Sequence, residues 1–84
     1  MLNDRIRDVI RAEARLGVDV ETLPDDGDLY QAGMTSHASV NLMLALENEF
    51  DVEFPDRMLR RSVFENVASI RLALVELCAE ESAA

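Results

Sequence analysis

The sequence has few residues that could cross-link it, bind a metal or anchor it in a membrane. Its 84 residues include one cysteine, Cys78, one histidine and no lysine, and only 5% are aromatic. A single cysteine excludes an internal disulfide, and we expect it to be a small buried residue of the last helix. Without a CxxC or HExxH pattern, no metal site is predicted. No apolar run reaches about 18 residues and no signal-peptide core is present, so we expect a cytoplasmic protein without a membrane span.

Basic residues are missing from the middle of the chain. The net charge is −9, and the segment from Leu16 up to and including Asp56 has ten acidic residues but no Arg or Lys. Binding to a phosphate backbone needs a basic patch, which argues against nucleic acid as a partner. The acidic middle either attracts a basic protein surface or only keeps the protein in solution. Composition leaves both interpretations open.

The spacing of apolar residues predicts an all-α fold of four helices without a strand. We expect one domain over residues 1–80 and a frayed tail at 81–84. The predicted helices span residues 2–16, 36–50 or 36–51, 57–62, and 67–79 or 67–80. The expected caps are Gly17 after the first helix, Thr35 or Ser36 before the second, Asp56 before the short third and Asn66 before the fourth.

A long loop at residues 18–34 separates the first two predicted helices. Pro24, the turn at residues 25–27 and Gly33 interrupt regular structure there. The expected anchors of this loop in the core are Val18, Val20, Leu23, Leu29 and Tyr30. Residues 52–55 form an extended link, because proline restricts the residue before it to extended conformations.

The helix predicted from residue 36 has apolar residues on two sides. One side carries Val40, Met43 and Leu44, and the other carries Leu42, Leu46 and Phe50. This pattern predicts a largely buried, central helix. The expected exposed strip carries Asn41, Asn48, Glu49 and Glu47.

The segment GMTSHASV places Ser36 at the start of that helix, after a glycine-containing loop. A hydroxyl there lies near free backbone N–H groups and the positive end of the helix dipole, which stabilise an attached phosphoester. A plain helix cap is the alternative, because Ser and Thr are common at this position. Ser36 and His37 are adjacent and point in different directions, and no third residue orients His37 as a base. The pattern therefore does not support a self-contained enzyme.

Residues 28–59, DLYQAGMTSHASVNLMLALENEFDVEFPDRML, are similar to, without strictly matching, a D-x-F/L-x-x-x-G-x-D-S-L pattern that is followed by an apolar helix and an E-x-x-F-x-x-x-I-P-type segment. The matching residues are Asp28, Tyr30, Gly33, Thr35, Ser36 and His37, and further on Leu42, Leu46, Glu47, Glu49, Phe50, Phe54 and Pro55. In this pattern, in its size and in its charge distribution, the chain resembles the acyl and peptidyl carrier proteins. The likeness covers most of the chain.

The resemblance implies a function. A phosphopantetheinyl transferase would join 4′-phosphopantetheine from coenzyme A to Ser36, and the thiol of this arm would carry an acyl or aminoacyl thioester. The chain would then be a monomeric, non-catalytic carrier between a loading ligase and an acyl-accepting enzyme. An unmodified helical interaction module with the same fold is the competing hypothesis.

The resemblance also implies that partner enzymes bind the second helix through basic patches. The expected docking residues are Thr35, His37, Val40, Met43, Glu47, Glu49, Asp51, Glu53, Asp56 and Met58. In the alternative interpretation, the acidic members only form a solvated face. Thr35 and His37 replace an Asp and a Leu of the family pattern, so either they mark dedicated partners or His37 is an exposed residue without a role.

The sequence around Ser36 also resembles that of small stand-alone carrier proteins. These carriers are paired with amino acid:carrier protein ligases that are similar to a truncated seryl-tRNA synthetase. This resemblance implies a small amino acid, such as glycine or alanine, as the cargo. Two roles are open for Met34, Met43, Met58 and Val63: they line the path of the arm between the second and third helices, or they pack in the core.

Overall fold

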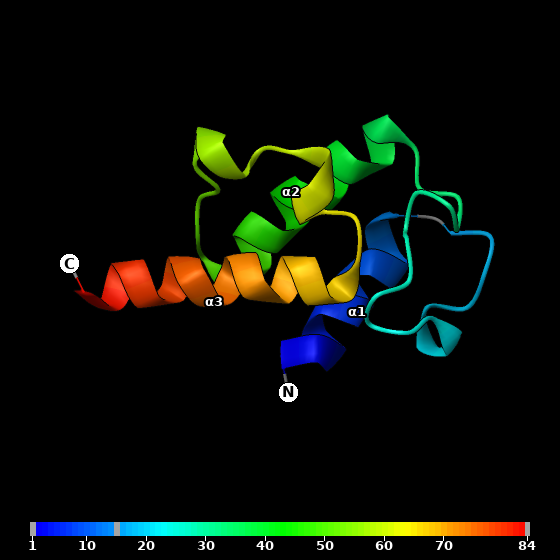
Figure 1. The fold of residues 1–84 in the computed structure, drawn as a ribbon, viewed down its shortest axis with the longest axis horizontal. Coiled ribbons are helices and arrows are strands. Elements are labelled where there is room, and N and C mark those ends of the chain that lie inside the picture. The colour runs from blue at the N-terminus through cyan, green and yellow to red at the C-terminus, as the bar shows by residue number, and fades with distance from the viewer. Residues whose placement is uncertain (1, 15, 84) are drawn as a thin grey trace.

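The computed structural model describes residues 2–14 and 16–83, and these contain three α-helices. They are α1 (Leu2–Glu13), α2 (Ser36–Phe50) and α3 (Val67–Ala83). A 3-10 turn, η1 (Val20–Thr22), lies in the long loop, and η2 (Asp56–Met58) and η3 (Arg61–Val63) connect α2 to α3. Figure 1 shows α1 passing behind α3, with α2 above them and the long loop far from the C-terminus. The described residues contain no strand, which confirms the predicted all-α class.

The predicted third helix is wrong in form. Two 3-10 turns replace it, because Leu59 (φ −84°, ψ 63°) and Arg60 (φ −126°, ψ 148°) leave the helical region between them. Asp56 is the first residue of η2 and not a cap, because Pro55 occupies the cap position without a side-chain hydrogen bond.

Two predicted helix ends are also corrected. The helix α1 ends at Glu13, before the predicted residue 16, while Arg15 lies outside the described residues. Gly17 lies in a bend beyond that end, where its N–H donates to the carbonyl of Ala32 (3.1 Å). The helix α3 continues to Ala83, so the expected tail is helical up to that residue, and Ala84 is outside the described part. Cys78 is exposed on α3 and not buried as expected.

The core lies where α1 packs against α2 and α3. Its completely buried side chains include Ile6, Ile10, Leu29, Leu42, Leu46 and Ile70. Only one face of α2 belongs to this core: Val40 is 51% exposed and Leu44 is 53% exposed. The prediction of a largely buried α2 is therefore wrong for this side, because neither α1 nor α3 covers it. None of the described helices is both long enough and apolar enough to cross a membrane.

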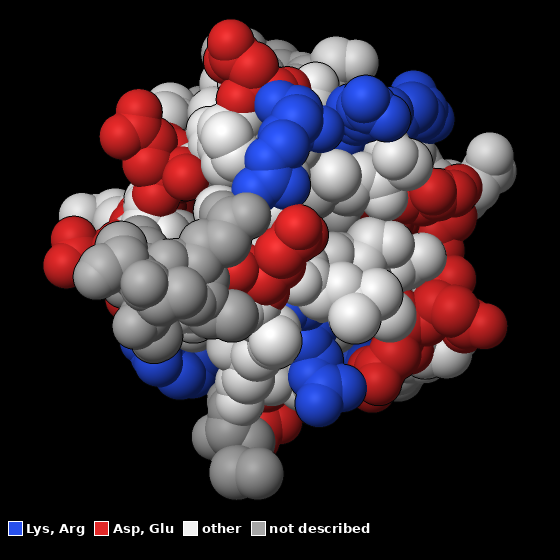
Figure 2. All heavy atoms as spheres, turned by 60° about the vertical axis from the view of Figure 1, so that its left-hand side comes forward, with Lys and Arg blue, Asp and Glu red and all other residues white. Residues whose placement is uncertain are grey.

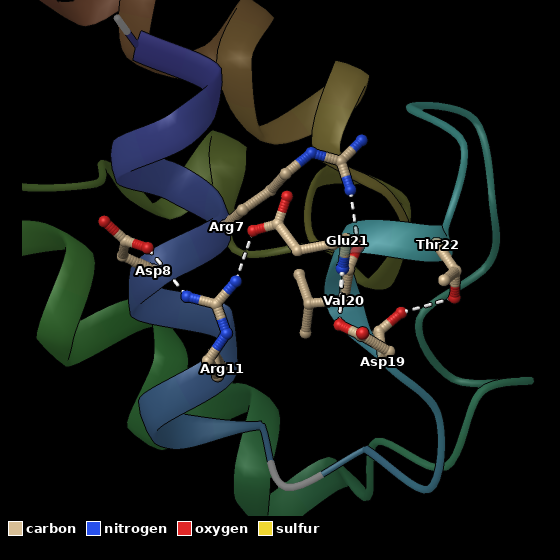
Figure 3. Close-up of polar contacts among 7 residues, drawn as sticks. All are labelled: Arg7, Asp8, Arg11, Asp19, Val20, Glu21 and Thr22. Atoms are coloured by element: carbon tan, nitrogen blue, oxygen red, sulfur yellow. Dashed lines mark hydrogen bonds and ion pairs between the residues drawn. The ribbon is translucent and has the colours of Figure 1, made fainter.

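Charged side chains of α1 hold the first part of the long loop (Figure 3). Arg7 donates to the carbonyl of Val20 (2.6 Å) and pairs with Asp25 (2.6 Å), and its side chain is only 12% exposed. Arg11 pairs with Asp8 (2.7 Å) and with Glu21. The hydrogen bonds to Asp8 and then to Glu21 raise the pKa of the Arg11 guanidinium above its ordinary value.

Backbone hydrogen bonds join the loop to the start of α3. The N–H of Leu29 donates to the carbonyl of Glu65 (2.7 Å), and the N–H of Ala68 donates to that of Asp25 (3.0 Å). Val20 and Leu29 are buried, and Leu23 and Tyr30 are partly buried against the core, as predicted. Val18 is 47% exposed, so it does not anchor the loop. The loop is therefore fixed at both α1 and α3 before it reaches α2.

Candidate functional site

A tight turn delivers the chain to the start of α2. The carboxylate of Asp28 accepts hydrogen bonds from the N–H groups of Tyr30 (2.8 Å) and Gln31 (3.3 Å). Gly33 has φ +119°, a conformation that side chains of L-residues rarely adopt. A Cβ at this position would also come within 3.3 Å of the backbone nitrogen of Gly17. Asp28 and Gly33 thus have a physical role, because they form the turn that precedes Ser36.

The first turn of α2 begins directly after this loop. Thr35 is the N-cap, and its hydroxyl accepts from the N–H of Ala38 (3.0 Å). The prediction of a cap at Thr35 or Ser36 is thus confirmed for Thr35. The side chain of Ser39 donates back to the carbonyl of Ser36 (2.7 Å). Ser36 is exposed at the first helical position, and N–H groups there have no acceptor within the helix.

Ser36 lies on the wall of an open groove of about 420 Å³, which we call the Ser36 groove. One wall comes from α2, and the others come from the loop at Tyr30 and from the connection around η3. The groove is lined by Tyr30, Ser36, Ser39, Val40, Met43, Leu59, Arg60, Arg61 and Phe64. This lining includes two arginines and no carboxylate, although the whole chain has 17 acidic residues.

The space-filling view shows the same contrast on a larger scale. Figure 2 shows one face of the molecule, with basic side chains in a band along its top and acidic side chains to the left and right. The view is turned about the vertical axis, so the band lies at the height of η2 and η3 in Figure 1.

The arrangement around Ser36 does not supply catalytic partners. His37 is exposed in the first turn of α2, and it is not among the groove-lining residues. Among residues 2–14 and 16–83, no group of three or more His, Cys, Asp or Glu side chains could hold a metal ion. What the site offers chemically is one accessible hydroxyl at a helix start, beside an apolar groove with two cations.

The predicted docking acids differ in the contacts that they make. Glu47 is half-buried, and its carboxylate accepts from the N–H of Phe54 (2.8 Å), so it holds the chain after α2. Glu49 pairs with Arg5 on α1 (3.4 Å). Asp51, Glu53 and Asp56 are exposed, and Asp51 ends α2 in the left-handed conformation (φ 52°). Glu47 therefore has a structural role, whereas the last three acids remain available to a partner.

The structure also sorts the remaining predicted residues. Met58 is 4% exposed within the core, so it is not part of a docking surface, and the same holds for Met34 at 4%. Val63 is partly buried against the core. Met43 and Val40 do line the Ser36 groove.

Sequence reasoning missed the residues on the wall of the Ser36 groove that lies opposite α2. These residues are Leu59, Arg60, Arg61 and Phe64. The available signal was three arginines within residues 57–61, immediately after an acidic stretch.

Fold and site together define a small helical domain in which the hydroxyl of Ser36 is exposed at a helix start, beside a groove. The sequence profile of the family described as "Phosphopantetheine attachment site" matches residues 4–71. The chain belongs to this family, which confirms the resemblance to carrier proteins, and its cofactor is 4′-phosphopantetheine.

Solved and curated relatives agree with this assignment. The chain is 44% identical over 69 residues to the aminoacyl carrier protein of Agrobacterium fabrum, which covers 82% of this chain and 83% of the relative. It also matches the crystal structure of an engineered Bradyrhizobium japonicum glycine:[carrier protein] ligase complexed with carrier protein from Agrobacterium tumefaciens and ATP. That match has a TM-score of 0.88 and 39% identity over 90% of this chain and 99% of the other.

A further match is a structure of the Bradyrhizobium japonicum ligase complexed with glycylated carrier protein. Its TM-score is 0.74 with 26% identity, covering 86% of this chain and 96% of the other.

The residues at the start of α2 fit phosphopantetheine. The attachment needs an exposed hydroxyl, and Ser36 has an exposed hydroxyl at the helix start. The phosphodiester is an anion, and unpaired N–H groups and the helix dipole favour an anion at this end. The adjoining groove offers both cations and apolar surface to the rest of the group.

Proposed function

We propose that this chain is an aminoacyl carrier in which Ser36 bears 4′-phosphopantetheine. The observation that carries the proposal is the exposed Ser36 at the start of α2, directly behind the turn formed by Asp28 and Gly33. In the attachment step, the Oγ atom of Ser36 would form a bond to the phosphorus nearest the pantetheine part of coenzyme A. The bond from this phosphorus to the bridging oxygen breaks, 3′,5′-ADP leaves, and the hydroxyl proton passes to a base on a phosphopantetheinyl transferase.

The cargo proposed for the thiol is a small amino acid, bound as a thioester. The similarity to carriers seen with glycine:[carrier protein] ligases supports glycine as the first candidate. A loading ligase and a downstream acyl-accepting enzyme would be the partners, alongside the transferase. The chain itself would catalyse no step, because its exposed hydroxyl has no orienting base beside it. It would act as a cytoplasmic monomer.

The test of attachment is the intact mass after incubation with coenzyme A and a phosphopantetheinyl transferase. The wild-type chain is expected to gain one phosphopantetheine, and Ser36→Ala is expected to gain none. Ser39→Ala is the matched control, because Ser39 lies in the same helical turn and lines the same groove. Modification of Ser36→Ala would place the arm on another residue and contradict the proposal. No modification of the wild type by several transferases would also contradict it, and would favour an unmodified interaction module.

The test of cargo uses the modified chain with a glycine:[carrier protein] ligase, ATP and single amino acids. A Cys78→Ser background is useful, because Cys78 is an exposed second thiol. A mass increase of one aminoacyl group that hydroxylamine removes would support the thioester. A modified chain that accepts fatty acyl groups but no amino acid would point to a different cargo.

A further inference from the structure

The Ser36 groove combines features that match the part of the arm next to its attachment point. From Ser36 outward, phosphopantetheine has a phosphodiester anion and then a carbon with two methyl groups. The groove that begins at Ser36 has two arginines and the apolar side chains of Val40 and Met43 on α2. A groove with cations and apolar surface, but no carboxylate, is complementary to an anion followed by a methylated carbon.

The side chains of the two groove arginines, Arg60 and Arg61, differ in their contacts. Arg61 lies over the ring of Tyr30, with the guanidinium carbon 3.9 Å from the ring centroid. This contact limits the number of orientations of the Arg61 side chain while leaving its charge without a carboxylate partner. The side chain of Arg60 is exposed and makes no hydrogen bond or ion pair within the part of the chain that the structure describes. Both guanidinium groups are therefore available to an anion on the groove wall.

We propose that Arg60 and Arg61 position the phosphodiester of the arm and that its two methyl groups lie on Val40 and Met43. This inference rests on the proposed attachment to Ser36. The arm would then spend part of its time in the groove and not only in solvent, and a partner enzyme would have to draw it out. Arg60 and Arg61 are positioning residues, because they act on the orientation of the arm and not on its chemistry.

The test uses nuclear Overhauser effects in the modified chain, with isotope-labelled protein and an unlabelled arm. We expect contacts from the two arm methyl groups to the methyl groups of Val40 and Met43. In R60Q/R61Q, these contacts should weaken about threefold, the size expected for two partly exposed charge interactions. Salt at about 0.5 M should weaken them similarly in the wild type by screening.

Two further variants separate positioning from a general effect on structure. R60K/R61K keeps both charges and is expected to retain most of the contacts. R71Q removes an exposed arginine of α3 that does not line the groove, and it should leave them unchanged. Failure of the wild type to gain the arm would overturn both proposals. A modified chain without these contacts, or equal contacts in R60Q/R61Q and the wild type, would overturn only this inference.

Discussion

At the residue scale, the carboxylate of Glu47 has a structural role where a docking role was predicted. Its position on α2 and its charge predict a contact for a basic partner, but its side chain accepts from the N–H of Phe54. Phe54 in turn contacts Phe64 edge-on, with ring centroids 5.3 Å apart. Glu47 thus fixes the start of the connection that forms one side of the Ser36 groove.

Replacing Glu47 should therefore change stability. Glu47→Ala is expected to lower the free energy of unfolding by about 1–3 kcal/mol, because the buried N–H of Phe54 loses its charged acceptor. Glu47→Gln keeps an acceptor oxygen and should recover part of this loss. Urea unfolding followed by circular dichroism measures both values.

The matched control for this prediction is Glu49→Ala. Glu49 forms an exposed pair with Arg5, and such pairs contribute roughly 0–1 kcal/mol. Equal stability of Glu47→Ala and Glu49→Ala would mean that the hydrogen bond to Phe54 does not matter in solution.

At the scale of elements, side chains of α1 hold the first part of the long loop, whereas its own residues Asp28 and Gly33 form the turn in its second part. The first part contains the 3-10 turn η1, capped by Asp19, whose carboxylate accepts from the N–H of Glu21 (3.0 Å). Arg7 and Arg11, one turn apart on α1, bind this turn from the same side (Figure 3). Because the loop leads into Ser36, its order determines where the proposed attachment hydroxyl lies.

The two arginines of α1 should differ in their effect on stability. Arg7→Met removes a largely buried guanidinium that donates to the carbonyl of Val20, and we expect a loss of about 1–3 kcal/mol. Arg11→Met removes exposed ion pairs, which solvent screens, and its loss should be smaller than that of Arg7→Met. Thermal unfolding of both variants is the measurement, and hydrogen exchange at η1 reports whether the loop itself opens. A larger loss in Arg11→Met would contradict this ranking.

At the scale of the whole molecule, the charges are separated around the proposed attachment site. The Ser36 groove carries two arginines, and the far end of α2 and its following link carry the exposed acids Asp51, Glu53 and Asp56. A basic partner attracted by the net charge of −9 would be directed to the acidic end. Docking there would leave the groove and the arm accessible.

Charge reversal tests this arrangement. Glu53→Arg/Asp56→Arg is expected to weaken binding to a glycine:[carrier protein] ligase about tenfold at low salt and to flatten its salt dependence. Asp4→Arg/Asp26→Arg makes the same change in net charge at exposed positions of α1 and the loop, and should have a smaller effect. Calorimetric titrations at several salt concentrations provide the affinities. Equal weakening in the two variants would show that only net charge matters.

Local patterns predicted the parts of the fold that depend on local interactions. The cap at Thr35, the cap at Asn66 that accepts from the N–H of Ser69 (2.7 Å), and the turn at Gly33 follow from residue type and spacing. The short third helix was not predicted correctly, because its backbone follows the packing of Met58 and Phe64 into the core and not helix propensity. Similarly, periodicity shows that Val40 and Leu44 share a side of α2, but not that this side remains uncovered.

The sequence by itself determined the helical class, the position of Ser36 at a helix start and the acidic middle of the chain. Each of these follows from neighbours within a few residues or from composition. Only the tertiary structure decided that Glu47 is a structural acceptor, that Met58 is core, and that Arg60 and Arg61 line the same groove as Ser36. These relations join residues from different elements, and their proximity depends on how α1, α2 and α3 pack around a shared core.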